Sequence, residues 1–419
     1  MIERAAAEWA ASFRFEDAPA NVRETVESIF LDAIASGVAG STMQLVRDVE
    51  PVARDLGGGA GTTFLAGYAI TAATACDVYR PGLCHVTPVT VPPLLALAED
   101  GDRDLLAALT VGLELTTRLL VALNYPRLRG RGWHAPGVAG PVGAAAAAAR
   151  LLRLDARGVR NAMAHGALQS AGTFAALGTE AVKFTQARAA VAALLAASMA
   201  RAGVAASDAW LTAEDGGLAS TYTDDANPAA LVAGLGDEWE LSRISLRRWP
   251  AASSVQSLIA VCRLHAGPDA ADIVSARIAL SPGAYLVSGD RPWRTPLEAQ
   301  QSARWVAATV LTEGDWWLDQ KLGDPRIDAL ARRIEVVAND ELSDAAVRIE
   351  IEWSDSIVRG ERDTAPGDPE EPLTRAQIEA KLRQAAQSAS LDADEILAAV
   401  EAAAYSKLTG LLAAVAVRA

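Results

Sequence analysis

The chain has 419 residues, 51% hydrophobic and 21% charged, which is a globular composition with enough length for two domains. Its net charge of -14 argues against nucleic acid or an anionic membrane surface as a partner, because both attract a basic protein surface. The three cysteines have no zinc-type spacing, and their odd number does not fit the disulfide framework of a secreted protein. The start of the chain carries Glu3 and Glu8, which does not fit a signal peptide, so we expect a cytoplasmic protein.

Helical periodicity dominates the first 240 residues or so. Apolar residues at helical spacing predict helices at 22–38, 94–99, 104–123, 142–152, 156–171 and 181–202. Asp155 is placed to cap one of them and Gly203 to end another. Two glycine-containing segments, 54–68 and 127–132, predict loops. Gly57-Gly58-Gly59 lacks the lysine of a phosphate-binding loop, so it predicts a flexible turn.

The pattern changes after about Leu241. Helices are predicted at 253–265 and 297–311, and strands at 273–278 and 347–353, with weak alternation at 333–337. The strict alternation of 347–353 is typical of a half-buried antiparallel strand. Helices return from Thr374. We therefore predict a mainly α chain in which a large all-helical domain, 1–245 and 373–419, encloses a smaller α+β domain, 246–372.

Only four histidines occur, and none has the spacing of a metal site. His85 and His134 lie in loops directly before predicted helices, where backbone N–H groups can converge on an anion. His165 lies within a predicted helix and His265 ends one, so both are expected to be structural. The histidines that could carry chemistry are therefore His85 and His134.

Two cationic positions have an ordinary interpretation and a functional one. Lys183 begins an apolar helix, so it is either a solvated lysine or a partly buried one that holds a carboxylate or acts as a base. Arg247 and Arg248 lie where the two predicted domains join, and are either surface arginines or ligands for a carboxylate. The residues alone leave both alternatives open.

The segments around these residues resemble the MmgE/PrpD family. The central match runs from Gly132-Trp133-His134 through Gly140-Pro141-Val142-Gly143 and the alanine run, and continues to Lys183. Further matching segments are 31–34, 39–41, 85–99, 161–163, 169–172, 280–283 and 295–299. The resemblance spans most of the chain, and the order and spacing of its segments carry it.

The resemblance implies a helical domain made from both chain ends, an inserted α+β lid domain, a homodimer, and no metal or organic cofactor. It implies that His85, His134 and Lys183 line a catalytic site, which removes a proton next to a carboxylate of a small di- or tricarboxylate. Histidine near neutral pKa suits that step, and positive groups stabilise the enolate-like charge as it forms. The expected substrate-binding residues are Asp77, Tyr79, Gln186, Arg247 and Tyr285.

This chain departs from the family pattern at several positions. Gln186 and Ala252 stand where the family has histidines, and Gln300 or Gln301 stands where it has a lysine. Two hypotheses follow. One is a lyase or isomerase of the dehydratase, decarboxylase or epimerase type, in which fewer acid–base groups favour isomerisation or an unusual substrate of specialised metabolism. The other is a catalytically altered relative that binds a ligand or partner.

Overall fold

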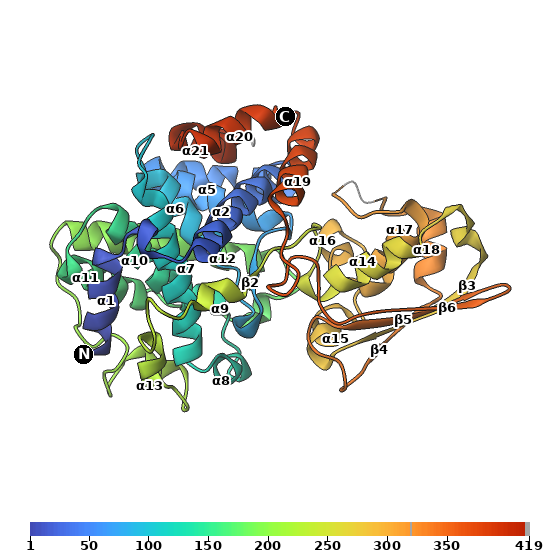
Figure 1. Ribbon diagram of the computed structural model, residues 1–419, viewed down its shortest axis with the longest axis horizontal. Coiled ribbons are helices and arrows are strands. Elements are labelled where there is room, and N and C mark those ends of the chain that lie inside the picture. The colour runs from blue at the N-terminus through green and yellow to red at the C-terminus, as the bar shows by residue number, and fades with distance from the viewer. Residues whose placement is uncertain (319–320, 415–419) are drawn as a thin grey trace. The chain divides into compact units, whose positions relative to one another are not determined.

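The computed structural model describes residues 1–318 and 321–414, which fall into two units (Figure 1). The helical unit comprises Met1–Ala72, Cys76–Ile244 and the chain from Arg375 onward, and the mixed unit comprises Ala73–Ala75 and Ser245–Thr374. The chain is 59% helix and 9% strand, with the larger sheet in its C-terminal part, which confirms the mainly helical fold class.

Buried helices form the centre of the helical unit, where α10 packs on α6, α7, α11 and α12, and α5 packs on α2, α6 and α12. Asp155 accepts a hydrogen bond from Gly158 N at the start of α11, as predicted. The elements of this unit are α1 (Ile2–Ser12), α2 (Ala20–Ser41), α3 (Gln44–Asp48), α4 (Glu50–Leu56), α5 (Gly58–Ala72), β1 (Val78–Tyr79), α6 (Thr87–Leu97), α7 (Asp104–Ala122), α8 (Tyr125–Gly130), α9 (Ala135–Val138), α10 (Gly140–Leu151), α11 (Ala156–Ala167), α12 (Ala181–Arg201), α13 (Leu218–Tyr222), α19 (Arg375–Ser388), α20 (Ala393–Glu401) and α21 (Tyr405–Ala414).

The two predicted loops are largely helical, so those predictions were wrong. Segment 54–68 holds the end of α4 and most of α5, and α8 covers most of 127–132. Gly57 breaks the chain between α4 and α5 with a positive φ of 67°. Gly61 instead permits close packing, because an added Cβ would overlap Ala53 O, and one at Gly67 would lie 3.0 Å from Ala187 Cα. Gly57 thus separates two helices, whereas Gly61 and Gly67 lie within α5 and allow neighbouring backbone to approach it closely.

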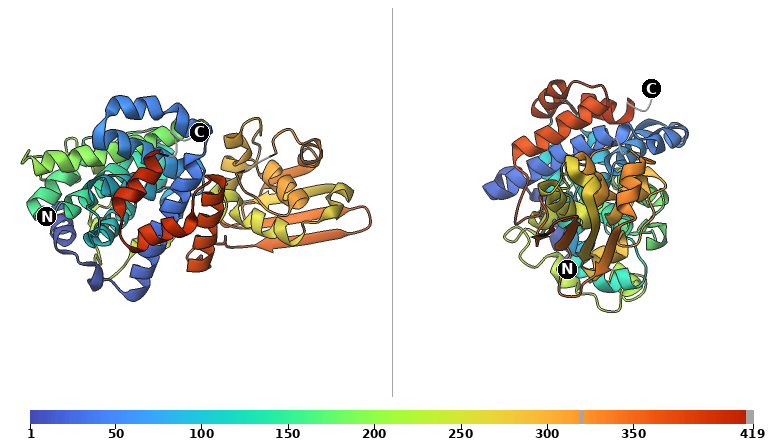
Figure 2. Two further views of the ribbon diagram at one scale, coloured as in Figure 1. Left: turned by 90° about the horizontal axis from the view of Figure 1, so that it is seen from above. Right: turned by 90° about the vertical axis from the view of Figure 1, so that its right-hand side faces the viewer.

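The C-terminal helices complete the helical unit. Helix α19 packs on α2, and α21 packs on α5, α2 and α6. Figure 2 shows these red helices lying against the blue N-terminal ones. By length and composition α7, and the bent pair Ala20–Ser41 with Gln44–Leu56, could cross a bilayer. The apolar window of α7 is 89% buried inside the protein, so packing accounts for its hydropathy.

The mixed unit contains a four-stranded sheet in the order β4-β3-β5-β6. Strand β3 pairs parallel with β4 and antiparallel with β5, which pairs antiparallel with β6. The antiparallel strand predicted at 347–353 is thereby confirmed. The predicted helix 297–311 is two helices, because Ser302 caps a new start through Trp305 N. The elements are α14 (Gln256–Leu264), β3 (Ile273–Leu280), α15 (Pro282–Ser288), α16 (Pro296–Ala299), α17 (Ala303–Glu313), α18 (Pro325–Ala331), β4 (Ile334–Ala338), β5 (Val347–Trp353) and β6 (Ile357–Arg362), and the short strand β2 (Ile244–Ser245) includes the last residue of the preceding helical segment and the first residue of this unit.

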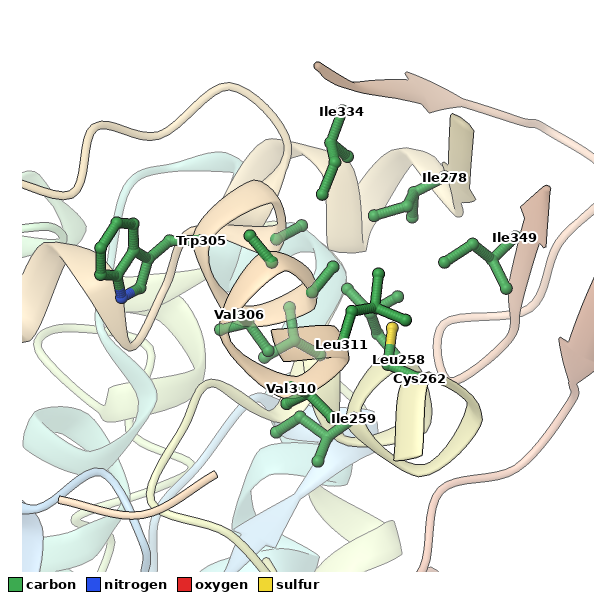
Figure 3. Close-up of a cluster of buried hydrophobic side chains, with 14 of the residues drawn as sticks. Leu258, Ile259, Cys262, Ile278, Trp305, Val306, Val310, Leu311, Ile334 and Ile349 are labelled. Atoms are coloured by element: carbon green, nitrogen blue, oxygen red, sulfur yellow. The ribbon is translucent and has the colours of Figure 1, made fainter. Parts of the chain in front are cut away.

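One face of this sheet carries the core of the mixed unit. Figure 3 shows Ile278, Ile334 and Ile349 pointing from three strands toward apolar side chains of α14 and α17. The opposite face carries cross-strand ion pairs, Arg277–Glu335 at 3.4 Å and Arg359–Glu350 at 2.7 Å, whose side chains are mostly exposed. This two-faced pattern is the physical cause of the alternation in the sequence.

Candidate active site of the helical unit

The loop that carries His134 is held by a second loop from further along the chain. His134 N donates to Gly172 O at 3.0 Å, and Phe174 N donates to Gly132 O at 2.7 Å. Ala171 N donates to Gly137 O at 2.9 Å. These backbone bonds fix His134 at the start of the short helix α9.

Both loops lie tightly against α12. A Cβ added at Gly137 would overlap Ala171 O and would come within 2.7 Å of Thr185 Cγ2. One added at Gly172 would lie 2.6 Å from the same methyl carbon, Thr185 Cγ2. Only glycine therefore permits this approach, which brings the His134 loop onto the turn of α12 that carries Lys183 and Gln186.

His134 is buried and polar, with only 4% of its surface exposed. Its Nδ1 has no hydrogen-bond partner in the described chain, and its ring meets Phe174 edge-on at a centroid distance of 5.9 Å. Burial, and then the positive charges of Arg129 and Lys183, lower the pKa of His134 to about 4. The imidazole is therefore neutral at pH 7, with cationic side chains close enough to act on it.

The two cations come from different elements. Lys183 is 5% exposed, and its Nζ donates to Thr71 O on α5 at 2.7 Å. Arg129, on α8, places Cζ 3.6 Å from the centroid of the Phe174 ring. Positive charge beside a neutral imidazole is an arrangement that an anionic ligand would stabilise. Sequence reasoning missed Arg129 and Phe174, although Arg129 lies in the basic stretch that it assigned to a loop.

Gln186 lies one helical turn after Lys183 on the buried side of α12. It is 1% exposed, and its Oε1 has no hydrogen-bond partner in the described chain. A buried acceptor without a partner costs free energy. Two buried polar atoms, His134 Nδ1 and Gln186 Oε1, thus lack a hydrogen-bond partner in the described chain, and Gln186 shares α12 with Lys183, whose charge acts on His134.

His85 lies just before α6, a helix that packs on α5, α10 and α12. Its Nδ1 is 2.6 Å from Asp77 O. Since a carbonyl oxygen can only accept, Nδ1 carries the hydrogen, and the lone pair of the neutral ring is on Nε2. Nε2 is therefore the atom of His85 that can take up a proton.

The Asp77 carboxylate organises the start of α6. It accepts from Val86 N at 2.8 Å, from Thr87 N at 3.0 Å and from the Thr87 hydroxyl. Burial raises the pKa of Asp77, against the effect of these hydrogen bonds. Both oxygens are occupied by the chain, so Asp77 positions the His85 loop.

Tyr79 is also fully buried, and its hydroxyl donates to Glu240. It borders a pocket of about 320 Å³ whose other lining residues include Tyr125, Asn124, Asp225 and Arg243, with neither His134 nor Lys183 among them. Burial and the bond to Glu240 raise the pKa of Tyr79. The structure thus places Tyr79 at this pocket, whose lining residues do not include His134, Arg129 or Lys183.

Arg247 and Tyr285 belong to the mixed unit. Arg247 is buried, and its Nη1 donates to Ala251 O at 3.4 Å, while Tyr285 on α15 packs against the apolar core of that unit. Ala252 N donates to Gln300 O at 2.9 Å. A part for Arg247 and Tyr285 in the site stays a prediction.

The chain is similar to known proteins over most of its length. The MmgE/PrpD N-terminal domain matches residues 4–229 and the MmgE/PrpD C-terminal domain matches residues 249–404. A cis-aconitate decarboxylase-like protein of Aspergillus oryzae is 27% identical over 91% of this chain and 89% of its own length. Cis-aconitate decarboxylases of Aspergillus terreus and Homo sapiens are 25% and 26% identical, over 91% and 76% of this chain and 88% and 71% of their own. The chain therefore belongs to the MmgE/PrpD family.

Proposed function

We propose that this chain is a lyase that acts on a small di- or tricarboxylate, with His134 as the group that moves a proton at a carbon next to a carboxylate. The observation that carries the proposal is the His134 cluster, in which a neutral buried imidazole with an unpartnered nitrogen is flanked by Arg129 and Lys183. Family membership and the cis-aconitate decarboxylase relatives support the substrate class.

Among the possible reactions, decarboxylation has the most support, because each of the relatives named above is a decarboxylase or decarboxylase-like. When a carboxylate leaves as carbon dioxide, the electron pair of the broken carbon–carbon bond remains on the substrate, and a proton must be added at carbon. Lys183 and Arg129 would stabilise the anion that forms, and His134 would supply the proton. Dehydration would use the same cluster in the opposite sense, with His134 removing the proton before hydroxide departs.

A pKa of about 4 means that His134 holds no proton at pH 7 in the ligand-free site. A bound dianion beside the imidazole would favour the charged form and raise that pKa. Ligand binding would thus favour the protonated form of His134, which is the acid that the reaction needs. Lys183 serves as a carboxylate-binding group, and His85 as a second proton acceptor through Nε2.

The test is incubation of the purified chain with cis-aconitate and a panel of hydroxy- and unsaturated di- and tricarboxylates in deuterated water, followed by proton NMR. We expect one acid to lose carbon dioxide or water, or to exchange deuterium at carbon. His134→Gln should lower the rate by about 10²–10⁴-fold. His165→Gln is the matched control. His165 lies on α11 and its Nε2 bonds Val204 O rather than any residue assigned to the site, so this variant should leave the rate unchanged.

The other hypothesis is a binding protein without catalysis. One observation supports it: Gln186, which has no acid–base group, stands where the family has a histidine. It predicts that carboxylates bind, in a manner sensitive to Lys183→Met, while no acid is converted or exchanged. Absence of both turnover and carboxylate binding would reject the lyase proposal. The homodimer, the cytoplasmic location, the lid role of the mixed unit and independence from cofactors stay predictions.

A further inference from the structure

The pocket of about 320 Å³ that Tyr79 borders lies wholly within the helical unit. One side is the tight turn after β1, with Tyr79 and Pro81, and another is the junction of α7 and α8, with Leu120 and Tyr125. Its volume is at the lower end of the roughly 300–1,000 Å³ that is usual for small-molecule sites. The pocket therefore suits a small ligand with an apolar or aromatic part.

Two oppositely charged residues, Asp225 and Arg243, line this pocket, and in the described chain each pairs with a different residue. Asp225 accepts from Asn124 Nδ2 at 2.9 Å and lies 3.6 Å from Arg127 Nε, and both contacts use its Oδ2. Arg243 donates from Nη1 to Glu240 at 2.7 Å. No described residue hydrogen-bonds to Oδ1 of Asp225 or to Nη2 of Arg243. One pocket thus offers an acceptor for a cation and a donor for an anion.

Two tyrosines supply the aromatic part of the lining. Tyr79 is fully buried and donates to Glu240, which also accepts from Arg243, so one carboxylate links the Tyr79 hydroxyl to the guanidinium. Tyr125 is only 6% exposed, and its hydroxyl has no hydrogen-bond partner in the described chain. A buried hydroxyl without a partner costs free energy, which a ligand that bonds to it would offset.

The elements that form these two sides also carry residues of the candidate active site. Tyr79 exchanges two backbone hydrogen bonds with Cys84, at 2.7 and 3.1 Å, and His85 follows directly. Tyr125 lies one helical turn before Arg129 on α8. Burial raises the pKa of Tyr125, and the positive charge of Arg129 opposes that rise, while the same charge acts on His134. A ligand in this pocket would therefore contact both elements.

We propose that this pocket binds an aromatic α-amino acid in its zwitterionic form and couples it to the candidate active site. Asp225 accepts hydrogen bonds from the ammonium group, and Arg243 donates to the carboxylate. The side chain of the ligand packs among Tyr79, Leu120 and Tyr125, where aromatic pairs stabilise beyond their buried area. Only the coupling rests on the proposed function, since binding in the pocket needs neither His134 nor Lys183.

The first test is calorimetric titration of the full-length protein with L-phenylalanine, L-tyrosine and L-tryptophan. We expect at least one to bind, and its amine and acid analogues, which each lack one charge, to bind at least tenfold more weakly. Val121→Trp, at a lining position that is 42% exposed, should block binding by filling the pocket. Val52→Trp, at a similarly exposed position on α4 that is not among the lining residues, should not. Absence of binding at millimolar concentration, or equal binding by Val121→Trp, would overturn the proposal.

A pair of neighbouring carboxylates tests the charge recognition. Asp225→Asn should weaken amino-acid binding at least tenfold. Asp224→Asn, at the adjacent exposed position that pairs with Arg131 and is not among the lining residues, should leave it unchanged. Tyr125→Phe should weaken binding and should stabilise the ligand-free protein, because it removes a buried hydroxyl without a partner. Equal affinities of wild type and Asp225→Asn would show that the ammonium group is not recognised here and would overturn the zwitterion assignment.

The coupling is tested by titrating the tightest-binding acid of the carboxylate panel with and without saturating amino acid. We expect its affinity to change by about fivefold or more in the wild type and to stay constant in Val121→Trp. An unchanged affinity in the wild type would overturn the coupling. If the amino acid binds as expected while no carboxylate binds, the proposed function fails and the assignment of this pocket stands, so the two failures are distinguishable.

Discussion

Lys381 on α19 donates to Asp32 on α2 at 2.6 Å, with the two side chains only 2% and 1% exposed. The contact joins the C-terminal part of the chain to the N-terminal part inside the helical unit. Taking both charges out of water is costly, and their attraction offsets this only while both are present. The pair therefore makes the stability of this unit depend on its C-terminal helices.

Removing one member of that pair should destabilise the protein strongly. We expect Lys381→Met to lower the free energy of unfolding by about 3–5 kcal/mol, because it leaves the Asp32 carboxylate buried without its cation. Arg375→Met is the control on the same helix, since its partner Glu379 is partly exposed and the pair should contribute less than about 1 kcal/mol. Urea unfolding measures both. If both variants lost the same free energy of unfolding, the buried Lys381–Asp32 pair would not have the structural importance given to it here.

Asp77 should act through α6 rather than through the ligand. Asp77→Ala leaves the amide groups of Val86 and Thr87 without their acceptor, and should cost about 1–3 kcal/mol of stability. Asp77→Asn keeps an acceptor oxygen and should cost less. A variant that binds carboxylates more weakly at unchanged stability would instead place Asp77 in contact with substrate.

The sequence reveals the fold where its signal is local. The alternation of 347–353 predicts β5 because one face of that strand packs on α14 and the other face is more exposed to solvent. Segment 54–68 suggested a loop because a glycine that permits helix–helix contact, such as Gly61, looks in sequence like one that breaks a helix, such as Gly57. Only the approach of Gly61 to Ala53, and of Gly67 to Ala187, distinguishes the two.

The candidate site was also predictable only where the signal is local in the sequence. His134 and Lys183 could be selected from loop position, charge and resemblance. Arg129 and Phe174 could not, because their nearness to His134 depends on backbone bonds between two loops that are far apart in sequence. Nor does the sequence reveal that the carboxylate of Asp77 is occupied by Val86 and Thr87.

Gln186 should show a trade of stability for binding. Its unpartnered Oε1 costs the ligand-free protein free energy, so Gln186→Met, which keeps the volume, should raise stability by up to about 1–3 kcal/mol. If Oε1 accepts a hydrogen bond from the ligand, the same variant should bind that ligand more weakly. Thermal unfolding and calorimetric titration measure the two effects. A stability loss without a change in affinity would make Gln186 a packing residue.

Ligand binding should be accompanied by proton uptake. The pKa of His134 is about 4 in the ligand-free site, and a bound dicarboxylate should raise it toward or above its ordinary value. Between about pH 4.5 and 7, the complex would then hold more protons than the separate partners. Titration calorimetry in two buffers of different ionisation enthalpy measures the uptake. His134→Gln should abolish it, whereas equal uptake in that variant would assign the proton to another group.

His134 should also make the stability of the ligand-free protein depend on pH. Its pKa is about 4 when folded and 6.5 ordinarily, so between these values the unfolded chain binds the extra proton. The stabilisation is therefore complete above about pH 6.5 and declines as pH falls toward 4, by at most roughly 3 kcal/mol. Other buried groups titrate as well, so the measurement is the difference between wild type and His134→Gln in urea unfolding at pH 7.5 and pH 4.5. The wild type should lose more stability than the variant over that interval, because only its unfolded state gains the imidazolium charge. A constant difference would mean that His134 accepts a proton as readily in the folded protein as in water, and the neutral imidazole assigned to the site would be wrong.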